Sequence, residues 1–149
     1  MRVLIQRTTA ASVVIEGKIN GQIEKGLVLL VGICAEDTVE DIDWLVQKIA
    51  SMRIFTDEEG KMNLSVQEIG GAFLVISQFT LFASTKKGNR PGFTNSAKPE
   101  VAVPLYEEFI RRLKSTGIKV ETGIFGADMK VQLINDGPVT IWLDSKNKE

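Results

Sequence analysis

The sequence contains no histidine, and this absence limits the chemistry open to the protein. Histidine is the commonest general base near neutral pH and the commonest transition-metal ligand. With one cysteine, Cys34, the chain has no disulfide framework and no spacing typical of a zinc site. The acidic residues follow no calcium-loop pattern. We therefore expect no metal and no cofactor, and any catalysis must proceed without imidazole.

Long hydrophobic runs and an excess of charge are also missing. No stretch approaches the roughly 18 consecutive apolar residues of a membrane-spanning helix, and the N-terminal apolar stretch is too short for a signal peptide. The net charge of −1 is unlike the basic excess of proteins that coat nucleic acid. We therefore expect a cytoplasmic protein with no membrane partner, although recognition of a nucleic-acid end stays open.

The 149 residues, 44% of them apolar, are enough to bury one core and predict a single compact domain over residues 1–149. Most of the pattern is typical of strands, and residues 27–31 form an apolar run that predicts a strand covered on both faces. The other predicted strands are 2–7, 12–15, 53–55, 73–76, 119–122, 129–135 and 139–143. The class is therefore mixed α/β with sheets dominant.

Two helices are expected between these strands. Thr38 is placed to cap a helix that runs to about Met52, because apolar residues recur behind it at helical spacing. The second helix carries Leu105, Phe109 and Leu113 and ends near Gly117. Its start at Pro99 or at Pro104 stays open, because proline fits a first turn but kinks a helix interior.

Cys34 follows the apolar run of residues 27–33. This position predicts a buried thiol, and no neighbouring residue is of a kind that lowers a thiol pKa. We therefore do not expect Cys34 to act as a nucleophile.

The segment Ser77-Gln78-Phe79-Thr80 directly follows the predicted strand 73–76. If the strand continues, its period of two places Gln78 and Thr80 on one face and Ser77 and Phe79 on the other. An amide and a hydroxyl would then point together from the mouth of a sheet. The simpler interpretation is that these are ordinary strand residues, and the pattern alone favours it.

Two further segments have both a functional and a structural interpretation. Asn135-Asp136-Gly137-Pro138-Val139-Thr140 combines a glycine, which admits close approach of a ligand to the main chain, with a proline that restricts it; the alternative is a turn between two strands. Lys86-Lys87-Gly88-Asn89-Arg90 holds three positive charges on a predicted loop, either a contact for nucleic acid or a solvated loop.

Four segments occur in order along the whole chain: Met1-Arg2-Val3-Leu4-Ile5-Gln6-Arg7, Ser77-Gln78-Phe79-Thr80-Leu81, Lys86-Lys87-Gly88-Asn89-Arg90-Pro91 and Asn135-Asp136-Gly137-Pro138-Val139-Thr140. Together they resemble the D-aminoacyl-tRNA deacylases, formerly called D-tyrosyl-tRNA deacylases. The resemblance implies barrel-like β-sheets with two main helices. It also implies hydrolysis of the ester between a D-amino acid and the 3′ end of tRNA.

The resemblance further implies a homodimer with shared active sites. The Gly137–Pro138 bond would be cis, and its two carbonyl oxygens would enter the partner's site, face residues 77–80 there and exclude L-amino acids. We expect the main-chain N–H groups of Phe79 and Thr80 to hold the oxyanion, with Gln78 orienting the ribose or the water and Ser77 beside them. Lys86, Lys87 and Arg90 are expected to contact the tRNA.

Three alternatives stay open from the residues themselves. Thr80 is a candidate nucleophile by analogy with other acyl-transfer enzymes, but its motif contains no base; activation of water by the ribose 2′-hydroxyl is the preferred alternative. A second possible enzyme removes small amino acids, such as glycine or mischarged L-alanine, from tRNA. The third is a non-catalytic, nucleic-acid-binding dimer that uses residues 86–90, which the near-neutral charge disfavours.

Overall fold

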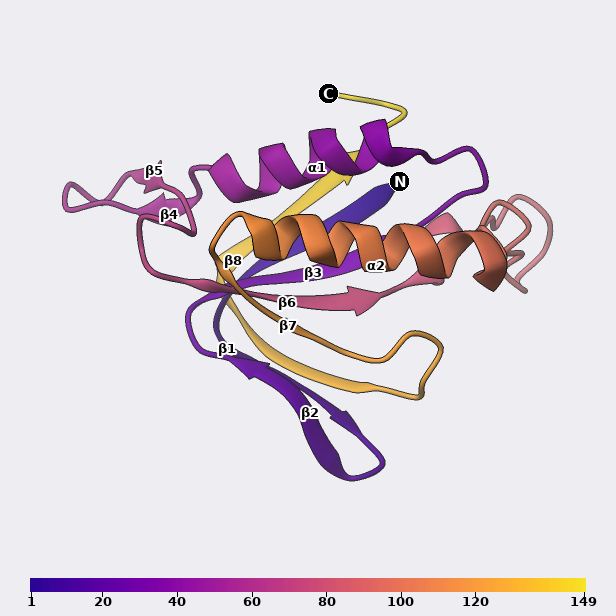
Figure 1. The fold of residues 1–149 in the computed structure, drawn as a ribbon, viewed down its shortest axis with the longest axis horizontal. Helices are drawn as coiled ribbons and strands as arrows, with labels where there is room; N and C mark the ends of the chain where they lie inside the picture. Colours follow the sequence, from indigo (N-terminus) through magenta and orange to yellow (C-terminus); the bar gives the residue numbers. More distant parts are fainter.

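The computed structural model describes residues 1–149 and contains eight strands, two α-helices and one short 3₁₀ helix. Figure 1 shows both α-helices on the same side of a curled sheet. The elements in chain order are β1 (Arg2–Ile15), β2 (Lys18–Ile23), β3 (Gly26–Gly32), α1 (Val39–Ser51), β4 (Phe55–Thr56), β5 (Met62–Leu64), β6 (Ala72–Ser77), η1 (Phe79–Phe82), α2 (Pro99–Ser115), β7 (Lys119–Thr122) and β8 (Lys130–Asp144).

Strand β1 organises the sheet because it pairs with three other strands. One edge of β1 pairs with β3 in its first half and with β2 in its second half, and β8 runs along the other edge; all three pairings are antiparallel. Beyond β3 the sheet continues with β6 and β7, which run parallel to β3 and to each other. The two parallel connections contain α1 and α2, as crossover connections between parallel strands usually do.

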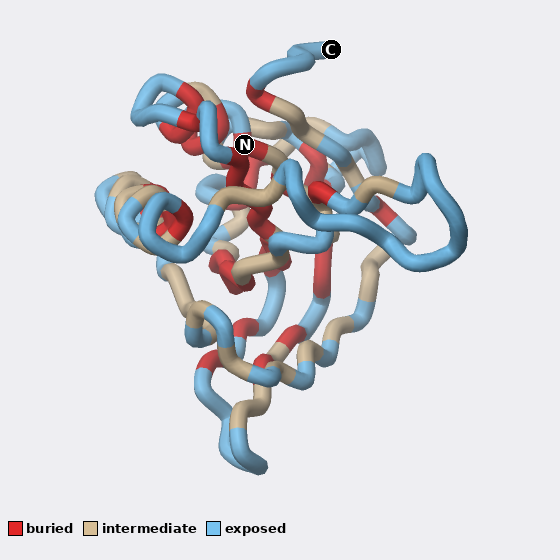
Figure 2. Tube along the Cα trace, turned by 90° about the vertical axis from the view of Figure 1, so that its right-hand side faces the viewer, coloured by how far each residue is buried: buried red, intermediate tan, exposed pale blue.

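The main core lies between the helices and the sheet. Ile42 and Leu45 of α1 and Phe109 and Leu113 of α2 are fully buried against the sheet, where Phe73 is among the largest buried side chains. Figure 2 shows buried residues concentrated where helices and strands meet, while the hairpin tip at the bottom is exposed. The helices therefore cover one face of the sheet.

A second, smaller cluster fills the curl of the sheet. Val13, Val28, Leu74 and other apolar side chains of β1, β2, β3 and β6 meet there. Strand β2 approaches β7 without a ladder of main-chain hydrogen bonds: Asn20 Nδ2 donates to the carbonyl oxygen of Thr122 at 2.8 Å. The sheet is thus a nearly closed barrel.

The predicted class is confirmed: the fold is mixed α/β, sheet-dominated and barrel-like, with two main helices. The first helix begins after Thr38 and ends at Ser51, with Asp41 Oδ2 accepting the Thr38 main-chain N–H at 2.8 Å. The second begins at Pro99 and contains Pro104, which settles the position of its start. No helix combines the length and apolar character that a membrane crossing requires.

Some predicted boundaries were wrong. Residues 2–7 and 12–15, which were expected to form two strands, belong to the single strand β1. The residues Gly17-Lys18 and Asn20-Gly21 are typical of hairpin turns; the turn between β1 and β2 is formed by Glu16 and Gly17, and Asn20-Gly21 lies within β2. The predicted strand 53–55 is reduced to β4, which pairs with β5 beyond the turn. Residues 136–138 do not separate two strands, because β8 continues through them. Each difference depends on a pairing partner that is distant in sequence.

Candidate active site at the carboxyl ends of the parallel strands

The candidate site is a cleft of about 330 Å³ where β3 and β6 end. Ligands of sheets with parallel strands commonly bind beyond the carboxyl ends of those strands, where loops replace the ladder. Ser77, Gln78 and Phe79 form one side of the cleft. The remaining lining residues come from β3, β6, the segment before α2, α2 itself and the segment from residue 125 into β8: Val31, Ile33, Ile76, Ser96, Ala97, Ala102, Phe125, Gly126, Ala127, Asp128, Met129 and Val131.

The local structure of residues 77–80 differs from the prediction. Strand β6 ends at Ser77, and Phe79 begins the 3₁₀ helix η1, so the period of two that was used to place Gln78 and Thr80 on one face does not apply. Their side chains nevertheless meet, because Gln78 Nε2 donates a hydrogen bond to Thr80 Oγ1. The two polar groups are brought together by the tight turn of the chain.

This turn leaves two neighbouring main-chain donors free. The N–H of Gln78 still donates to the carbonyl oxygen of Val31 at 2.7 Å, which anchors the end of β6 to β3. The N–H groups of Phe79 and Thr80 open the 3₁₀ helix, where the first amides have no partner within the helix. No other oxygen of the chain accepts a hydrogen bond from them. They form a pair of adjacent donors: Phe79 belongs to the cleft wall, whereas Thr80 is exposed and follows it just outside the lining.

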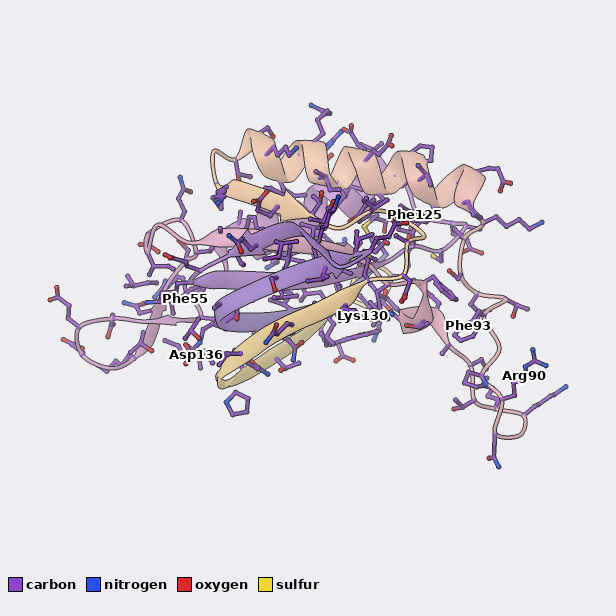
Figure 3. All side chains as sticks on the ribbon, turned by 90° about the horizontal axis from the view of Figure 1, so that it is seen from below. Phe55, Arg90, Phe93, Phe125, Lys130 and Asp136 are labelled. Carbon is purple, nitrogen blue, oxygen red and sulfur yellow. The ribbon has the colours of Figure 1, made fainter.

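The segment that faces η1 across the cleft was missed in the sequence. Residues 125–129 follow β7, and their loop is held by the N–H of Gly123, which donates to the carbonyl oxygen of Val75 at 3.1 Å. The ring of Phe125 lies 5.7 Å from that of Tyr106. Figure 3 shows Phe125 and Phe93 at the same end of the sheet, far from Asp136. The two glycines at 123 and 126 were the only local signal of a special backbone here.

Arg2 supports η1 from behind the cleft. Its Nη1 donates to the carbonyl oxygen of Leu81 at 2.9 Å, and its guanidinium lies 4.4 Å from the ring centre of Phe82. On its other side Arg2 Nε pairs with Asp144 Oδ2 at 2.9 Å. One side chain therefore ties η1 to β1 and β8.

The basic loop, residues 85–91, extends outward from the same end of the sheet. It is closed at its base by two main-chain hydrogen bonds between Ser84 and Gly92, of 2.8 and 2.9 Å. Lys86, Lys87 and Arg90 are exposed. None of the three has an ion-pair partner in the chain. Three uncompensated positive charges thus lie beyond η1.

Gly137 and Pro138 lie in a bulge of β8. The pairing advances from Gln6↔Thr140 to Thr8↔Asn135. Between these pairs β8 advances by five residues while β1 advances by two, so the extra residues of β8 bulge out of the ladder. The Gly137–Pro138 peptide bond is cis, and both residues are exposed.

The buried guanidinium of Arg7 holds this bulge from inside. Its Nε donates to the carbonyl oxygen of Asp136 at 3.2 Å, and its Nη1 donates to that of Ile54 at 2.7 Å. Asn135 closes the other side, with its Oδ1 accepting the N–H of Val139 at 3.2 Å. The exposed residues of the bulge are therefore held from both sides by side-chain hydrogen bonds.

A single chain keeps this bulge away from its own cleft. The bulge lies beside Arg7, which pairs with Leu27; Leu27 pairs in turn with Phe73, four residues before Ser77. At about 3.3 Å per residue and 4.8 Å per strand, the separation is on the order of 20 Å. Residues 77–80 and Gly137 are thus not brought together within one chain.

A wider hollow of about 850 Å³ lies at the opposite ends of β3 and β6. Lys25, Ala72 and Ile134 are among the residues that line it. No residue of the motifs singled out in the sequence contributes to its wall, and it is more open than the cleft. The smaller cleft is therefore the candidate active site.

Cys34 is buried next to the carboxylate of Asp37, which accepts the Cys34 main-chain N–H at 2.8 Å and is ion-paired with the amino group of Met1. Burial, together with the hydrogen bond to Asp37, raises the pKa of the Cys34 thiol to about 11. A thiol with this pKa is almost entirely protonated at pH 7, so it is a poor nucleophile. The prediction of a buried thiol is confirmed.

Comparisons with known proteins identify the class of this site. Residues 4–144 match the family described as D-Tyr-tRNA(Tyr) deacylase. A relative from Flavobacterium johnsoniae, named D-aminoacyl-tRNA deacylase, is 61% identical over 150 residues and covers 100% of both chains. The class is that of hydrolases acting on the aminoacyl-tRNA ester. This chain belongs to the D-Tyr-tRNA(Tyr) deacylase family.

Two solved structures share the fold. One, named c-Myc DNA Unwinding Element Binding Protein, has a TM-score of 0.90 and 39% identity, covering 97% of this chain and 98% of its own. The other is described as a "probable eukaryotic D-amino acid tRNA deacylase"; it has a TM-score of 0.82 over 95% of this chain and 97% of its own. At 18% identity, the second likeness concerns the fold alone.

The environment of Cys34 predicts that the thiol takes no part in catalysis. The variant Cys34→Ala should keep the hydrolase activity, and the native protein should react with iodoacetamide at pH 8 far more slowly than the urea-unfolded protein, because folding raises the thiol pKa to about 11. Mass spectrometry of alkylated protein measures both rates. Equal rates in the two states would contradict the buried assignment.

Proposed function

We propose that residues 1–149 form one domain that hydrolyses D-aminoacyl-tRNA to the free D-amino acid and tRNA in the cytoplasm, where aminoacylated tRNA is used. The observation that carries the proposal is the pair of free N–H groups of Phe79, in the cleft wall, and of Thr80, the next residue. Full-length identity of 61% to a relative with this name supports the substrate.

The two N–H groups act on the tetrahedral intermediate. Water attacks the ester carbonyl carbon and the carbonyl oxygen becomes an oxyanion. The bond to the ribose oxygen then breaks as that oxygen takes the proton that the attacking water gives up. Donors already aimed at the oxyanion need no reorganisation, and one such donor typically lowers the barrier by about 2.7–4 kcal/mol. Phe79 and Thr80 would supply the larger part of catalysis through their backbone.

The proton chemistry is assigned to the substrate. Thr80 Oγ1 accepts a hydrogen bond from the Gln78 side-chain amide. This amide nitrogen is a donor, so it cannot act as a base for the Thr80 hydroxyl. Without histidine, nothing beside Thr80 is suited to take its proton. We therefore favour the ribose 2′-hydroxyl, adjacent to the ester, as the group that positions the water. Gln78 then orients the ribose or the water, and Ser77 holds the end of β6.

The chirality filter is assigned to a second copy of the chain. Gly137–Pro138 lies on the order of 20 Å from residues 77–80 of its own chain, by the strand spacing above. Ile134 and Trp142, on either side of the bulge in β8, are 61% and 47% exposed, which provides apolar surface for a partner. In the proposed homodimer, the two carbonyl oxygens of the bulge enter the partner's cleft where an L side chain would project.

A main-chain filter suits an enzyme that accepts many D-amino acids. A side-chain pocket discriminates by size, at about 1–3 kcal/mol per methylene, and would restrict the amino acid processed. A rigid backbone wall rejects by handedness instead. Glycine has no side chain to reject, so glycyl-tRNA is expected to be hydrolysed as well.

The tRNA itself is proposed to contact the basic loop. The unpaired 3′ end enters the cleft with its terminal adenine, so few phosphates need neutralising, in agreement with a net charge of −1. Lys86, Lys87 and Arg90 have no ion-pair partner and extend from the cleft end of the sheet, which suits them to this role.

The filter predicts strong discrimination between D-tyrosyl-tRNA and L-tyrosyl-tRNA. The wild type should hydrolyse the D form and glycyl-tRNA, and leave the L form intact. In Gly137→Ala the added Cβ would lie 2.9 Å from Val139 Cγ2 and 3.1 Å from Arg7 Nη2 at a φ of +125°, so the carbonyls must move. The D-to-L ratio of kcat/KM should fall by more than about tenfold, or about 1.4 kcal/mol.

Arg7→Lys is the second variant for this test, because it keeps the charge but not both hydrogen bonds to Asp136 and Ile54. It should lower the same ratio, and urea unfolding of both variants checks that they fold. Equal hydrolysis of both enantiomers by the wild type would contradict the filter. Binding of tRNA without any hydrolysis would instead favour a nucleic-acid-binding protein.

The substrate-assisted mechanism predicts that Thr80→Ala keeps most of its activity. Its single-turnover rate constant should fall by less than about tenfold, whereas removal of an attacking nucleophile lowers the rate by on the order of 10⁶-fold. Thr80→Ser, which keeps the hydroxyl, is the matched control. Near-complete loss in the alanine variant with an intact fold would restore Thr80 as the nucleophile. Removing the 2′-hydroxyl from the terminal ribose of the substrate should lower the rate constant of the wild-type enzyme more than the Thr80→Ala substitution does.

The basic loop predicts a change in salt dependence. Replacing Lys86, Lys87 and Arg90 by glutamine should raise KM and reduce the slope of log KM against log salt by about 0.7 for each phosphate that the loop no longer neutralises. Lys18→Gln with Lys114→Gln removes exposed charges elsewhere and is the control. An unchanged slope in the loop variant would show that the loop does not bind the tRNA phosphates.

A further inference from the structure

Two exposed phenylalanines lie together beside the cleft, and the fold gives them no packing role. Phe79 is 54% exposed and Phe93 is 37% exposed. Their ring centres are 5.0 Å apart, and the rings meet edge to face at 71°. Large apolar side chains are usually covered, and an adjacent exposed pair next to a cleft marks a contact surface.

The position of this pair is defined on both sides. Phe79 lines the cleft itself, and Phe93 follows Gly92, which closes the base of the basic loop against Ser84. The N–H of Ser96, another residue of the cleft wall, donates to the carbonyl oxygen of Phe93 at 3.0 Å. A bound polymer chain that extends from the cleft toward the basic loop would therefore pass the two rings first.

The chemistry of this surface fits single-stranded nucleic acid. Proteins bind unpaired nucleotides by stacking bases on aromatic rings beside cationic groups that contact the phosphates. The edge-to-face arrangement leaves ring faces open for a base, and three unpaired cations lie beyond them in the loop. Figure 3 shows Phe93 and Arg90 at the same end of the molecule, with Arg90 farther out.

We propose that Phe93, supported by Phe79, stacks a base of the unpaired nucleotides that precede the terminal adenosine of the tRNA. This inference rests on the proposed function and adds a binding subsite to it. The subsite does not touch the ester. It binds the unpaired nucleotides of the tRNA where they leave the cleft. It contributes to binding of the tRNA end whatever amino acid the tRNA carries.

The test compares substrates of different length. A D-aminoacyl ester of the trinucleotide CCA contains the preceding nucleotides, and the same ester of adenosine alone does not. The wild type should have a higher kcat/KM for the trinucleotide than for the adenosine ester, because only the former reaches Phe93. Equal values for the two substrates would overturn the proposal, whereas no hydrolysis of either these esters or D-aminoacyl-tRNA would overturn the proposed function itself.

The variant Phe93→Leu keeps an apolar neighbour for Phe79 and removes the aromatic face. Its kcat/KM for the trinucleotide ester should fall about tenfold, within the roughly 5- to 150-fold that loss of base stacking costs. Its kcat/KM for the adenosine ester should stay at the wild-type value. Phe93→Tyr keeps the ring and should restore activity on the trinucleotide.

Two outcomes would count against the stacking role of Phe93. An equal loss on both esters would mean that Phe93 supports the cleft. Dissociation of the Phe93→Leu protein into monomers, measured by sedimentation, would mean that the pair covers a second copy of the chain. In the proposed case the variant keeps the oligomeric state of the wild type and loses only the contribution of the two extra nucleotides.

Discussion

The hydrogen bonding of β1 along both of its edges is the constraint on which the rest of the structure depends. Through β3 it aligns the parallel strands whose carboxyl ends form the cleft, and through β8 it positions the Gly137–Pro138 bulge. Because the register of β8 places the bulge opposite residues 6–8 of β1, the bulge lies beside Arg7 and away from the cleft. The same pairing pattern thus keeps the free N–H groups of Phe79 and Thr80 apart from the exposed bulge at Gly137–Pro138 within one chain.

The sequence was sufficient to predict the helices, most strands and the mixed class, because these depend on local periodicity and on caps such as Thr38. It was not sufficient for the two functional segments. The shape of residues 77–80 depends on Arg2, whose Nη1 holds the Leu81 carbonyl at 2.9 Å from a strand 79 residues earlier. The bulge in β8 likewise depends on Arg7, 129 residues before Asp136. No local pattern contains these contacts.

The far wall of the cleft was missed for a related reason. Residues 125–129 are mostly small or apolar and are typical of a loop, and only the register that ties Gly123 to Val75 brings them opposite η1. The amino-acid composition, in contrast, was directly informative about the chemistry, because it contains no histidine. A chain without histidine has to rely on groups other than an imidazole base, and the free amides of Phe79 and Thr80 are such groups.

In the proposed site, main-chain groups carry out the recognition. The N–H groups of one copy of the chain bind the oxyanion, and the C=O groups of the other copy exclude the L-amino acid. Main-chain groups are the same in every residue, so the identity of the side chain matters only where it controls backbone position. Groups that act by position must be held within a fraction of an ångström by their surroundings. In this chain Arg2 and Arg7 occupy those supporting positions, each a buried or half-buried guanidinium that donates to a carbonyl oxygen next to a functional segment. Arginine suits this task because its planar fork keeps several donors in fixed relative positions, which a lysine ammonium cannot do.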